Sequence, residues 1–204
     1  MCRFLLVKFD HSSEPQTLLS KFATMSQKSK ALDGDWQGDG WGVAWLNEEN
    51  MWQVKKSLSP VWEDTSVFPT IPSTRILVAH ARSASFPHHK GVIEFNQPYI
   101  SGKYAFVFNG LLRGVSLQNI PGKIGAEKIW SLLQQELKES APQEALEKVK
   151  KLLIENSKEI VALNMGLATP EGIYSLNHFT KHPEYYSLHQ WNEDSTKIIC
   201  SETL

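Results

Sequence analysis

The chain has 204 residues, of which 41% are hydrophobic and 21% are charged. This length can bury one full hydrophobic core, and the composition excludes a disordered polyelectrolyte and a coiled coil. Lysine and arginine together number 21 against 22 aspartate and glutamate residues, so the chain lacks the basic excess of a general nucleic-acid binder.

In chain order, the apolar run at residues 3–8 predicts a strand, and residues 15–31, with Pro15 in the first turn, predict a helix. Residues 40–46 and 51–56 predict two strands, because the polar residues between them are typical of a hairpin turn. Residues 57–73 contain three prolines and predict a long surface connection inside one domain.

Two further apolar runs, residues 75–81 and 104–108, predict strands. The spacing of leucine and isoleucine predicts helices over 125–138 and 142–156. Four more strands are expected at residues 160–168, 172–178, 185–191 and 197–200. This order is typical of an α+β fold with two antiparallel sheets and helices outside them, and not of alternating βαβ units.

The sequence contains two cysteines, Cys2 and Cys200, which are too few for a disulfide scaffold and favour a reducing compartment. The apolar run at residues 4–7 is too short for a signal peptide, and no stretch approaches the roughly 18–20 apolar residues that span a membrane. We expect a cytoplasmic protein with one domain over residues 1–204 and with neither a membrane nor a nucleic acid as partner. Cys200 is expected to pack as a small hydrophobic residue.

Cys2 is the first candidate for catalysis. Methionine aminopeptidases remove Met1 when the second residue is small, which leaves Cys2 with a free α-amine beside its thiol. The ordinary pKa of an α-amine is about 8 and that of a thiol about 8.5, so the two groups can exchange a proton near neutral pH. One residue can then supply both nucleophile and general base. The alternative is a small N-terminal residue without a role.

Polar side chains follow the strand expected at residues 75–81. Arg82 presents a planar fork that matches a carboxylate, and its small neighbours leave space for a ligand. His80, Arg82, Ser83 and Ser85 are therefore candidates for substrate binding. A surface arginine at a strand end is the simpler alternative.

Asn109 and Gly110 follow the strand expected at residues 104–108. Asn-Gly is first of all a turn, but an asparagine amide and a glycine N–H can also converge on a developing oxyanion. Two other turns contribute candidates for substrate binding: Asn96, in the sequence Asn-Gln-Pro-Tyr, and Trp41, in the glycine-rich residues 38–42.

These features occur in a fixed order: Cys2, Asp-Gly-Trp-Gly at 39–42, His-Ala-Arg at 80–82, Asn-Gln-Pro-Tyr at 96–99 and Asn-Gly at 109–110. The ordered set resembles the class-II glutamine amidotransferase domain, an N-terminal-nucleophile hydrolase. It is most similar to the stand-alone branch, whose members begin Met-Cys-Arg. The sequence at residues 200–204 is similar to the Ser-Glu-Pro-Leu strand late in such domains.

The resemblance implies a four-layer αββα sandwich that hydrolyses the glutamine side-chain amide through a γ-glutamyl thioester on Cys2. Ammonia is then released for water or for an acceptor on another chain. Carried over by position, Cys2 is the nucleophile, its α-amine the base, Arg82 the holder of the substrate α-carboxylate, and Asn109 with Gly110 the oxyanion hole. The implied partners are glutamine or a γ-glutamyl compound and a separate synthase subunit. No metal or organic cofactor is implied.

The sequence departs from the family pattern in two places. Members usually carry an aspartate, which binds the substrate α-amino group, at the start of the helix after the Asn-Gly strand. Gly125 and Ala126 stand here instead, and the nearby Glu127 normally matches a separate acid. Phe108 replaces the histidine that often precedes Asn-Gly, which makes the pocket less polar.

These departures keep two other functions open. The missing aspartate favours a stand-alone amidohydrolase that removes a γ-glutamyl group from a larger peptide or thiol metabolite. Glutamine hydrolysis is the more frequent activity in the family, which favours glutamine as the substrate. The alternative of another class is a non-catalytic binding domain that retains the fold.

Overall fold

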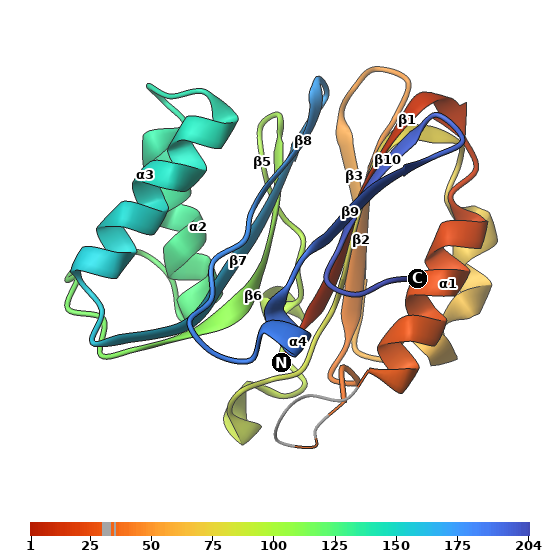
Figure 1. The fold of residues 1–204 in the computed structure, drawn as a ribbon. Helices are drawn as coiled ribbons and strands as arrows, with labels where there is room; N and C mark the ends of the chain where they lie inside the picture. Colours follow the sequence, from red (N-terminus) through yellow and green to blue (C-terminus); the bar gives the residue numbers. More distant parts are fainter. Residues whose placement is uncertain (30–33, 35) are drawn as a thin grey trace.

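The computed structural model describes residues 1–29, 34 and 36–204. In this part of the chain the strands form two antiparallel sheets that lie face to face (Figure 1). The six-stranded sheet has the order β3 (Trp52–Ser57), β2 (Trp41–Leu46), β4 (Thr74–Ala81), β1 (Arg3–Ser13), β10 (Thr196–Cys200) and β9 (His189–Glu193). The four-stranded sheet has the order β5 (Tyr99–Ser101), β6 (Tyr104–Arg113), β7 (Glu159–Thr169) and β8 (Gly172–Leu176).

Helices cover the outer face of each sheet (Figure 1). The six-stranded sheet is covered by α1 (Gln16–Lys28) and by the 3₁₀ helices η1 (Val61–Glu63) and η2 (Thr65–Thr70). The four-stranded sheet is covered by α2 (Gly125–Glu136) and α3 (Pro142–Glu155). Short helices lie in the connections: η3 (Pro87–His89), η4 (Ile93–Phe95) and α4 (Pro183–Tyr186).

Strand β1 shows how the sequence produces this stacking. Its side chains alternate, so Phe4 and Leu6 point toward the other sheet while Leu5 and Val7 point toward α1. All four side chains are fully buried, and each contributes about 1.5–3 kcal/mol of hydrophobic free energy. An unbroken apolar run at the start of the chain therefore becomes a central strand, between β4 and β10, that is buried on both faces.

The four-layer arrangement confirms the αββα sandwich expected from the sequence. Two antiparallel sheets pack through an apolar interface, and each outer face carries its own helix layer. The expected helices at residues 125–138 and 142–156 correspond to α2 and α3. Residues 30 and 31 of the expected first helix lie outside the described residues.

The structure differs from the expected elements in several places. Strand β6 continues to Arg113, so Asn109 and Gly110 lie within it instead of forming a turn after it, and β1 continues to Ser13. Residues 57–73 are not only a surface connection, because η1 and η2 bury Val61 and Phe68 against the six-stranded sheet. The strand β5 was not expected. The strand expected at residues 185–191 is wrong in its first half, where α4 buries Tyr185 and Tyr186 and the strand begins only at His189.

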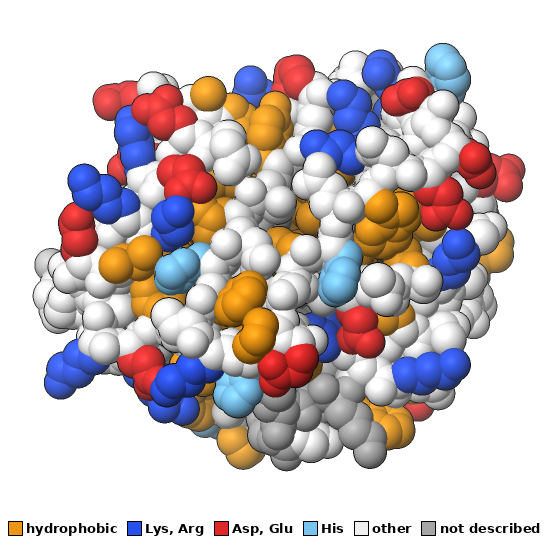
Figure 2. Space-filling view, in the orientation of Figure 1, with side chains coloured by type: hydrophobic (Ala, Val, Ile, Leu, Met, Phe, Trp, Pro, Cys, Tyr) orange, Lys and Arg blue, Asp and Glu red, His pale blue; other side chains and the backbone are white. Residues whose placement is uncertain are grey.

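On the face drawn in Figure 2, acidic and basic side chains are intermixed toward the edge, and hydrophobic side chains reach the surface nearer the middle. This mixture agrees with a formal net charge of −1. None of the helices in the described part of the chain has the length and apolar character needed to cross a membrane.

Candidate active site

A cavity of about 980 Å³ opens where the starts of β1 and α2 meet the ends of β4 and β6. It brings together six of the nine residues that the sequence singles out: Cys2, Arg82, Ser83, Ser85, Asn109 and Gly110. These residues come from both sheets and from segments far apart in the chain, so the fold assembles them into one site. The other three, His80, Trp41 and Asn96, are described but do not line the cavity.

Strand pairing places Cys2. Strand β1 pairs with β4 in a register that sets Arg3 opposite Ala81, so the preceding residue lies beside the polar segment that follows β4. The Cys2 thiol points to the carbonyl oxygen of Ser83 at 3.6 Å. Cys2 is partly exposed, whereas Cys200 is fully buried in the core and carries a free thiol whose pKa burial raises to about 12. The expectation that Cys200 packs as a small hydrophobic residue is confirmed.

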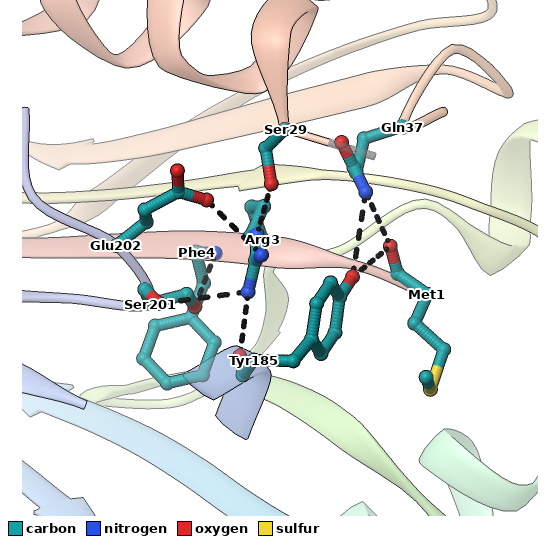
Figure 3. Close-up of polar contacts among 8 residues, drawn as sticks. All are labelled: Met1, Arg3, Phe4, Ser29, Gln37, Tyr185, Ser201 and Glu202. Carbon is teal, nitrogen blue, oxygen red and sulfur yellow. Dashed lines mark hydrogen bonds and ion pairs between the residues drawn. The ribbon is translucent and has the colours of Figure 1, made fainter. Parts of the chain in front are cut away.

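The residue before Cys2 is held by side chains from distant segments (Figure 3). The carbonyl oxygen of Met1 accepts hydrogen bonds from Gln37 Nε2 at 2.9 Å and from the Tyr185 hydroxyl at 3.1 Å. Gln37 is fully buried, and its Oε1 has no hydrogen-bond partner among the residues that the structure describes. Burial raises the pKa of the Tyr185 hydroxyl, so this group stays protonated. The sequence patterns did not point to Gln37 or Tyr185.

Arg3 fixes the strand that follows Cys2 (Figure 3). Its buried guanidinium donates to Ser29 Oγ at 2.7 Å and to the Tyr185 carbonyl at 2.9 Å, and it pairs with the Glu202 carboxylate at 3.0 Å. The guanidinium carbon also lies 3.8 Å from the centre of the Tyr185 ring. The Met-Cys-Arg start and the Ser-Glu pair near the C-terminus therefore meet at one place, with Ser201 Oγ accepting a hydrogen bond from the Phe4 N–H at 2.9 Å.

Asn109 lies in β6 with its side chain almost fully buried, at 2% exposure. Neither the oxygen nor the nitrogen of its amide has a hydrogen-bond partner in the described structure. An unpaired buried amide is costly, and such groups are found where a ligand completes the site. Next to it, a Cβ on Gly110 would collide with the Ala162 carbonyl and stand 2.9 Å from the Phe108 ring, so only glycine fits.

Arg82 brings a buried positive charge to the cavity. Its guanidinium donates to the His89 carbonyl at 2.8 Å and to Asn96 Oδ1 at 3.3 Å. Among the described residues no carboxylate forms an ion pair with it. A buried arginine without a carboxylate partner is electrostatically suited to an anionic ligand group.

Of the three candidate residues outside the cavity, Asn96 supports a residue inside it. Asn96 is fully buried and donates to the Ser57 carbonyl at 2.7 Å while its oxygen holds Arg82. Trp41 does not face the cavity, because strand alternation in β2 turns it into the outer core of the six-stranded sheet. There its ring packs against Phe68 of η2, and its indole N–H donates to Asp64 Oδ2 at 3.0 Å. His80 is fully buried, and burial, reinforced by Arg82, lowers its pKa to about 3, so it is neutral.

The glycine-rich residues 38–42 and the Asn-Gln-Pro-Tyr motif at 96–99 pack directly on each other. A Cβ on Gly40, which has φ +113°, would collide with the Asn96 amide, and one on Gly42 would collide with the Gln97 carbonyl. The Gln97 side chain in turn pairs with both backbone polar groups of Phe108. Gln97 belongs to the Asn-Gln-Pro-Tyr motif that the sequence analysis singled out. Only Asn96 of that motif was named as a candidate, although Gln97 also holds the site.

Glu127 does not replace the missing aspartate. Its carboxylate accepts from the N–H groups of Lys123 at 2.6 Å and Ile124 at 3.4 Å, which caps the start of α2. Of the described residues that line the cavity, Glu159 is the one acid, and it is paired with Lys181 and Arg113. No group of three or more metal-ligating side chains gathers within the described residues.

Comparisons with known proteins give the family. The family model for class-II glutamine amidotransferases matches residues 1–169. A glutamine aminotransferase class-II domain protein from Silicibacter pomeroyi has a TM-score of 0.65 at 13% identity, over 98% of this chain and 88% of that one. The glutamine phosphoribosylpyrophosphate amidotransferase of B. subtilis has a TM-score of 0.67 at 13% identity, and 98% of this chain spans 42% of its length. No curated protein matches this chain.

At 13% identity the solved structures establish the fold alone. The family match is stronger, because it extends over most of the chain and includes most of the segments that build the cavity. It implies an enzyme and supports glutamine amide hydrolysis in general terms. The protein belongs to the class-II glutamine amidotransferase family.

Proposed function

We propose that the protein hydrolyses the side-chain amide of glutamine or of a γ-glutamyl compound through a thioester on Cys2. The observation that carries the proposal is the unpaired, buried amide of Asn109 in the same cavity as the Cys2 thiol. A nucleophile beside a pre-placed, unsatisfied hydrogen-bond donor is the arrangement that acyl transfer requires. Arg82 adds the positive charge for the substrate α-carboxylate.

In the first half of the reaction, the Cys2 sulfur attacks the amide carbon while the freed α-amine of Cys2 takes the thiol proton. The oxyanion that forms is held by the Asn109 amide and the Gly110 N–H, each such donor being worth about 2.7–4 kcal/mol to the transition state. The α-ammonium then returns the proton to the leaving nitrogen. The carbon–nitrogen bond breaks, ammonia or an amine departs, and a γ-glutamyl thioester remains.

In the second half, the α-amine takes a proton from water, whose oxygen attacks the thioester carbon. The carbon–sulfur bond breaks, the thiolate regains the proton, and glutamate leaves. An acceptor amine on another chain can use the ammonia released in the first half. This cycle consumes one water per amide and leaves Cys2 unchanged.

We further propose that Gln37 and Tyr185 orient the α-amine. They now hold the Met1 carbonyl oxygen, which shares one planar peptide group with the Cys2 nitrogen. Removal of Met1 frees that nitrogen and also frees the Gln37 amide, whose Oε1 has no partner among the described residues. An amide oxygen that accepts an N–H hydrogen bond would aim the amine's lone pair at the thiol.

A γ-glutamyl compound larger than glutamine is the second candidate substrate, and the cavity of about 980 Å³ leaves room for it. The capping role of the Glu127 carboxylate leaves it engaged with the backbone of Lys123 and Ile124. Glu159 is also engaged, by Lys181 at 2.6 Å and Arg113 at 3.0 Å. The described cavity thus offers a cation for the α-carboxylate and no uncommitted acid for the α-ammonium, which both candidate substrates carry.

The decisive experiment compares Cys2→Ala with Cys200→Ala, which removes the other thiol. We expect ammonia release from glutamine, or glutamate release from γ-glutamyl amides, to be lost in Cys2→Ala and retained in Cys200→Ala. Full activity in Cys2→Ala would overturn the proposal. Intact mass of the purified protein shows whether Met1 is removed, and acid quenching during turnover should trap the γ-glutamyl adduct on Cys2. Retained Met1 together with indifference to Cys2 alkylation would favour the binding domain.

A further inference from the structure

We propose that the cavity contains a subsite for an apolar amine, so that the preferred substrate is a γ-glutamyl amide of an apolar amine rather than free glutamine. The inference rests on the proposed function, because it assigns the leaving group of the same reaction. It is carried by the size of the cavity and by the chemistry of one of its walls.

The cavity is larger than glutamine requires. Its volume of about 980 Å³ lies at the upper end of the range for pockets that enclose drug-sized ligands, about 300–1,000 Å³. Free glutamine is much smaller than such ligands, and its leaving group, ammonia, is smaller still. Most of the cavity therefore lies beyond the γ-glutamyl group that Cys2, Arg82 and Asn109 are proposed to hold.

One wall of this space is hydrophobic. The apolar wall consists of four half-buried side chains between the end of β6 and the start of α2: Leu112, Leu117, Ile120 and Ile124. Their inner sides pack against the core between the four-stranded sheet and its helices. Their remaining surface faces the cavity, with Ile129 of α2 among the buried residues behind them.

The apolar wall does not match ammonia or the polar ends of glutamine. Hydrocarbon side chains offer no hydrogen bond, and covering their surface is favourable only when the ligand is apolar as well. The wall begins at Leu112, two residues after Gly110 in β6, and it lines the same cavity as Cys2 and Asn109. A substituent on the leaving nitrogen is the part of the substrate that can reach it once the carboxylate is held by Arg82.

The reaction stays balanced with such a substrate. The carbon–nitrogen bond of the γ-glutamyl amide breaks, the Cys2 sulfur takes the γ-glutamyl group, and the thiol proton leaves on the apolar amine. Water then cleaves the thioester, so one amide and one water give one glutamate and one amine. No oxidant, reductant or further reactant is required.

The test uses the protein with Met1 removed and three substrates: glutamine, γ-glutamyl methylamide and γ-glutamyl n-hexylamide. The two alkylamides have leaving groups of similar basicity and differ in apolar surface. We expect kcat/KM for the hexylamide to exceed that for the methylamide by about tenfold or more, because hydrophobic pockets discriminate by such factors for small changes in apolar content. A ratio of one or less, with glutamine or the methylamide hydrolysed, overturns the subsite alone. Loss of all three activities overturns the proposed function.

Substitutions in the apolar wall test whether this wall forms the subsite. Ile120→Asp sets a charge in the apolar wall and should reduce the hexylamide-to-methylamide ratio about tenfold, and the milder Leu117→Ser should reduce it in the same direction. Val54→Asp makes the same kind of change on β3, at a side chain that is 47% exposed and does not line the cavity. It should leave the ratio unchanged. An unchanged ratio in folded Ile120→Asp and Leu117→Ser, checked by circular dichroism, contradicts the assignment.

Discussion

The Gln97 side chain holds both backbone polar groups of Phe108: Oε1 accepts from the Phe108 N–H at 2.6 Å, and Nε2 donates to the Phe108 carbonyl at 3.4 Å. Phe108 precedes Asn109, so this pairing fixes the backbone that carries the proposed oxyanion donors. Gln97 is itself fixed from behind, because its carbonyl packs on Gly42 too closely for any Cβ there. Two motifs that look unrelated in the sequence thus act on one strand.

Replacing Gln97 tests this positioning role. Gln97→Leu removes both side-chain hydrogen bonds to the buried backbone of Phe108, which costs about 1–3 kcal/mol of unfolding free energy. Because Asn109 then shifts, we expect kcat to fall about tenfold or more while KM changes little. Urea unfolding and steady-state kinetics measure the two effects. Gln53→Leu, on the exposed side of β3, should change neither, and wild-type kcat in Gln97→Leu would refute the role.

Asn109 and Asn96 are both buried asparagines, but we expect their replacement to have different effects on stability and on kcat. The Asn109 amide has no partner in the described structure, whereas Asn96 donates to Ser57 and accepts from Arg82. Asn109→Ala should therefore change stability little and lower kcat about 100- to 1,000-fold. Asn96→Ala should cost about 1–3 kcal/mol of stability. Thermal unfolding together with ammonia release separates the two, and an Asn109→Ala variant with normal kcat would remove it from the oxyanion hole.

The sequence predicts the parts of the site that lie at strand ends, and it does so for a physical reason. A polar residue such as Arg82, directly after an apolar run, lies at the end of a strand, whereas Asn109 follows another apolar run but lies inside β6, because that strand continues to Arg113. The same reasoning cannot tell which face of a strand a residue occupies, so Trp41 was expected at the substrate and lies in the outer core. Gln37 and Tyr185 were missed because their contacts with Met1 span 36 and 184 residues.

The fold was more predictable than the site because it depends on repeated apolar spacing. The run at residues 3–8 indicates a strand, and the structure shows that this strand is central, between β4 and β10. The error at residues 185–191 arises where aromatic residues favour a strand locally. There Pro183 begins a short helix after His182, which has φ 56°, and the two tyrosines pack on Val161 and Ala162.

Gln37 and Tyr185 supply a prediction for the protein with Met1 removed. Gln37→Leu and Tyr185→Phe should each lower kcat about tenfold with KM unchanged, because a misaligned α-amine slows proton transfer and not binding. Gln37→Glu should move the rising limb of the pH profile to higher pH, since a carboxylate favours the ammonium form. Tyr174→Phe removes a hydroxyl on β8 and serves as the control. A purely structural role would lower stability without moving the pH profile.

His80 makes stability depend on pH. Its pKa is about 3 in the folded protein, chiefly because of burial and then because of Arg82, against about 6.5 in an unfolded chain. The unfolded state therefore binds more protons below pH 6.5, and stability falls as the pH drops from 6.5 toward 3. We expect a loss of about 2 kcal/mol at pH 5 relative to pH 7.5. Chemical denaturation should show that His80→Leu removes this part of the pH dependence and that the exposed His11→Leu does not.

The start of α2 offers a gain-of-function test. Relatives usually carry an aspartate there, and here Gly125 lines the cavity with open space where a Cβ would stand. Gly125→Asp should place a carboxylate near the substrate α-ammonium, at a helix N-terminus that favours negative charge. We expect KM for glutamine to fall up to about fivefold, the equivalent of an ion pair worth about 1 kcal/mol, with kcat unchanged. Gly125→Asn has the same shape without the charge and should leave KM as it is. Equal effects of the two variants would show that shape rather than charge limits glutamine binding.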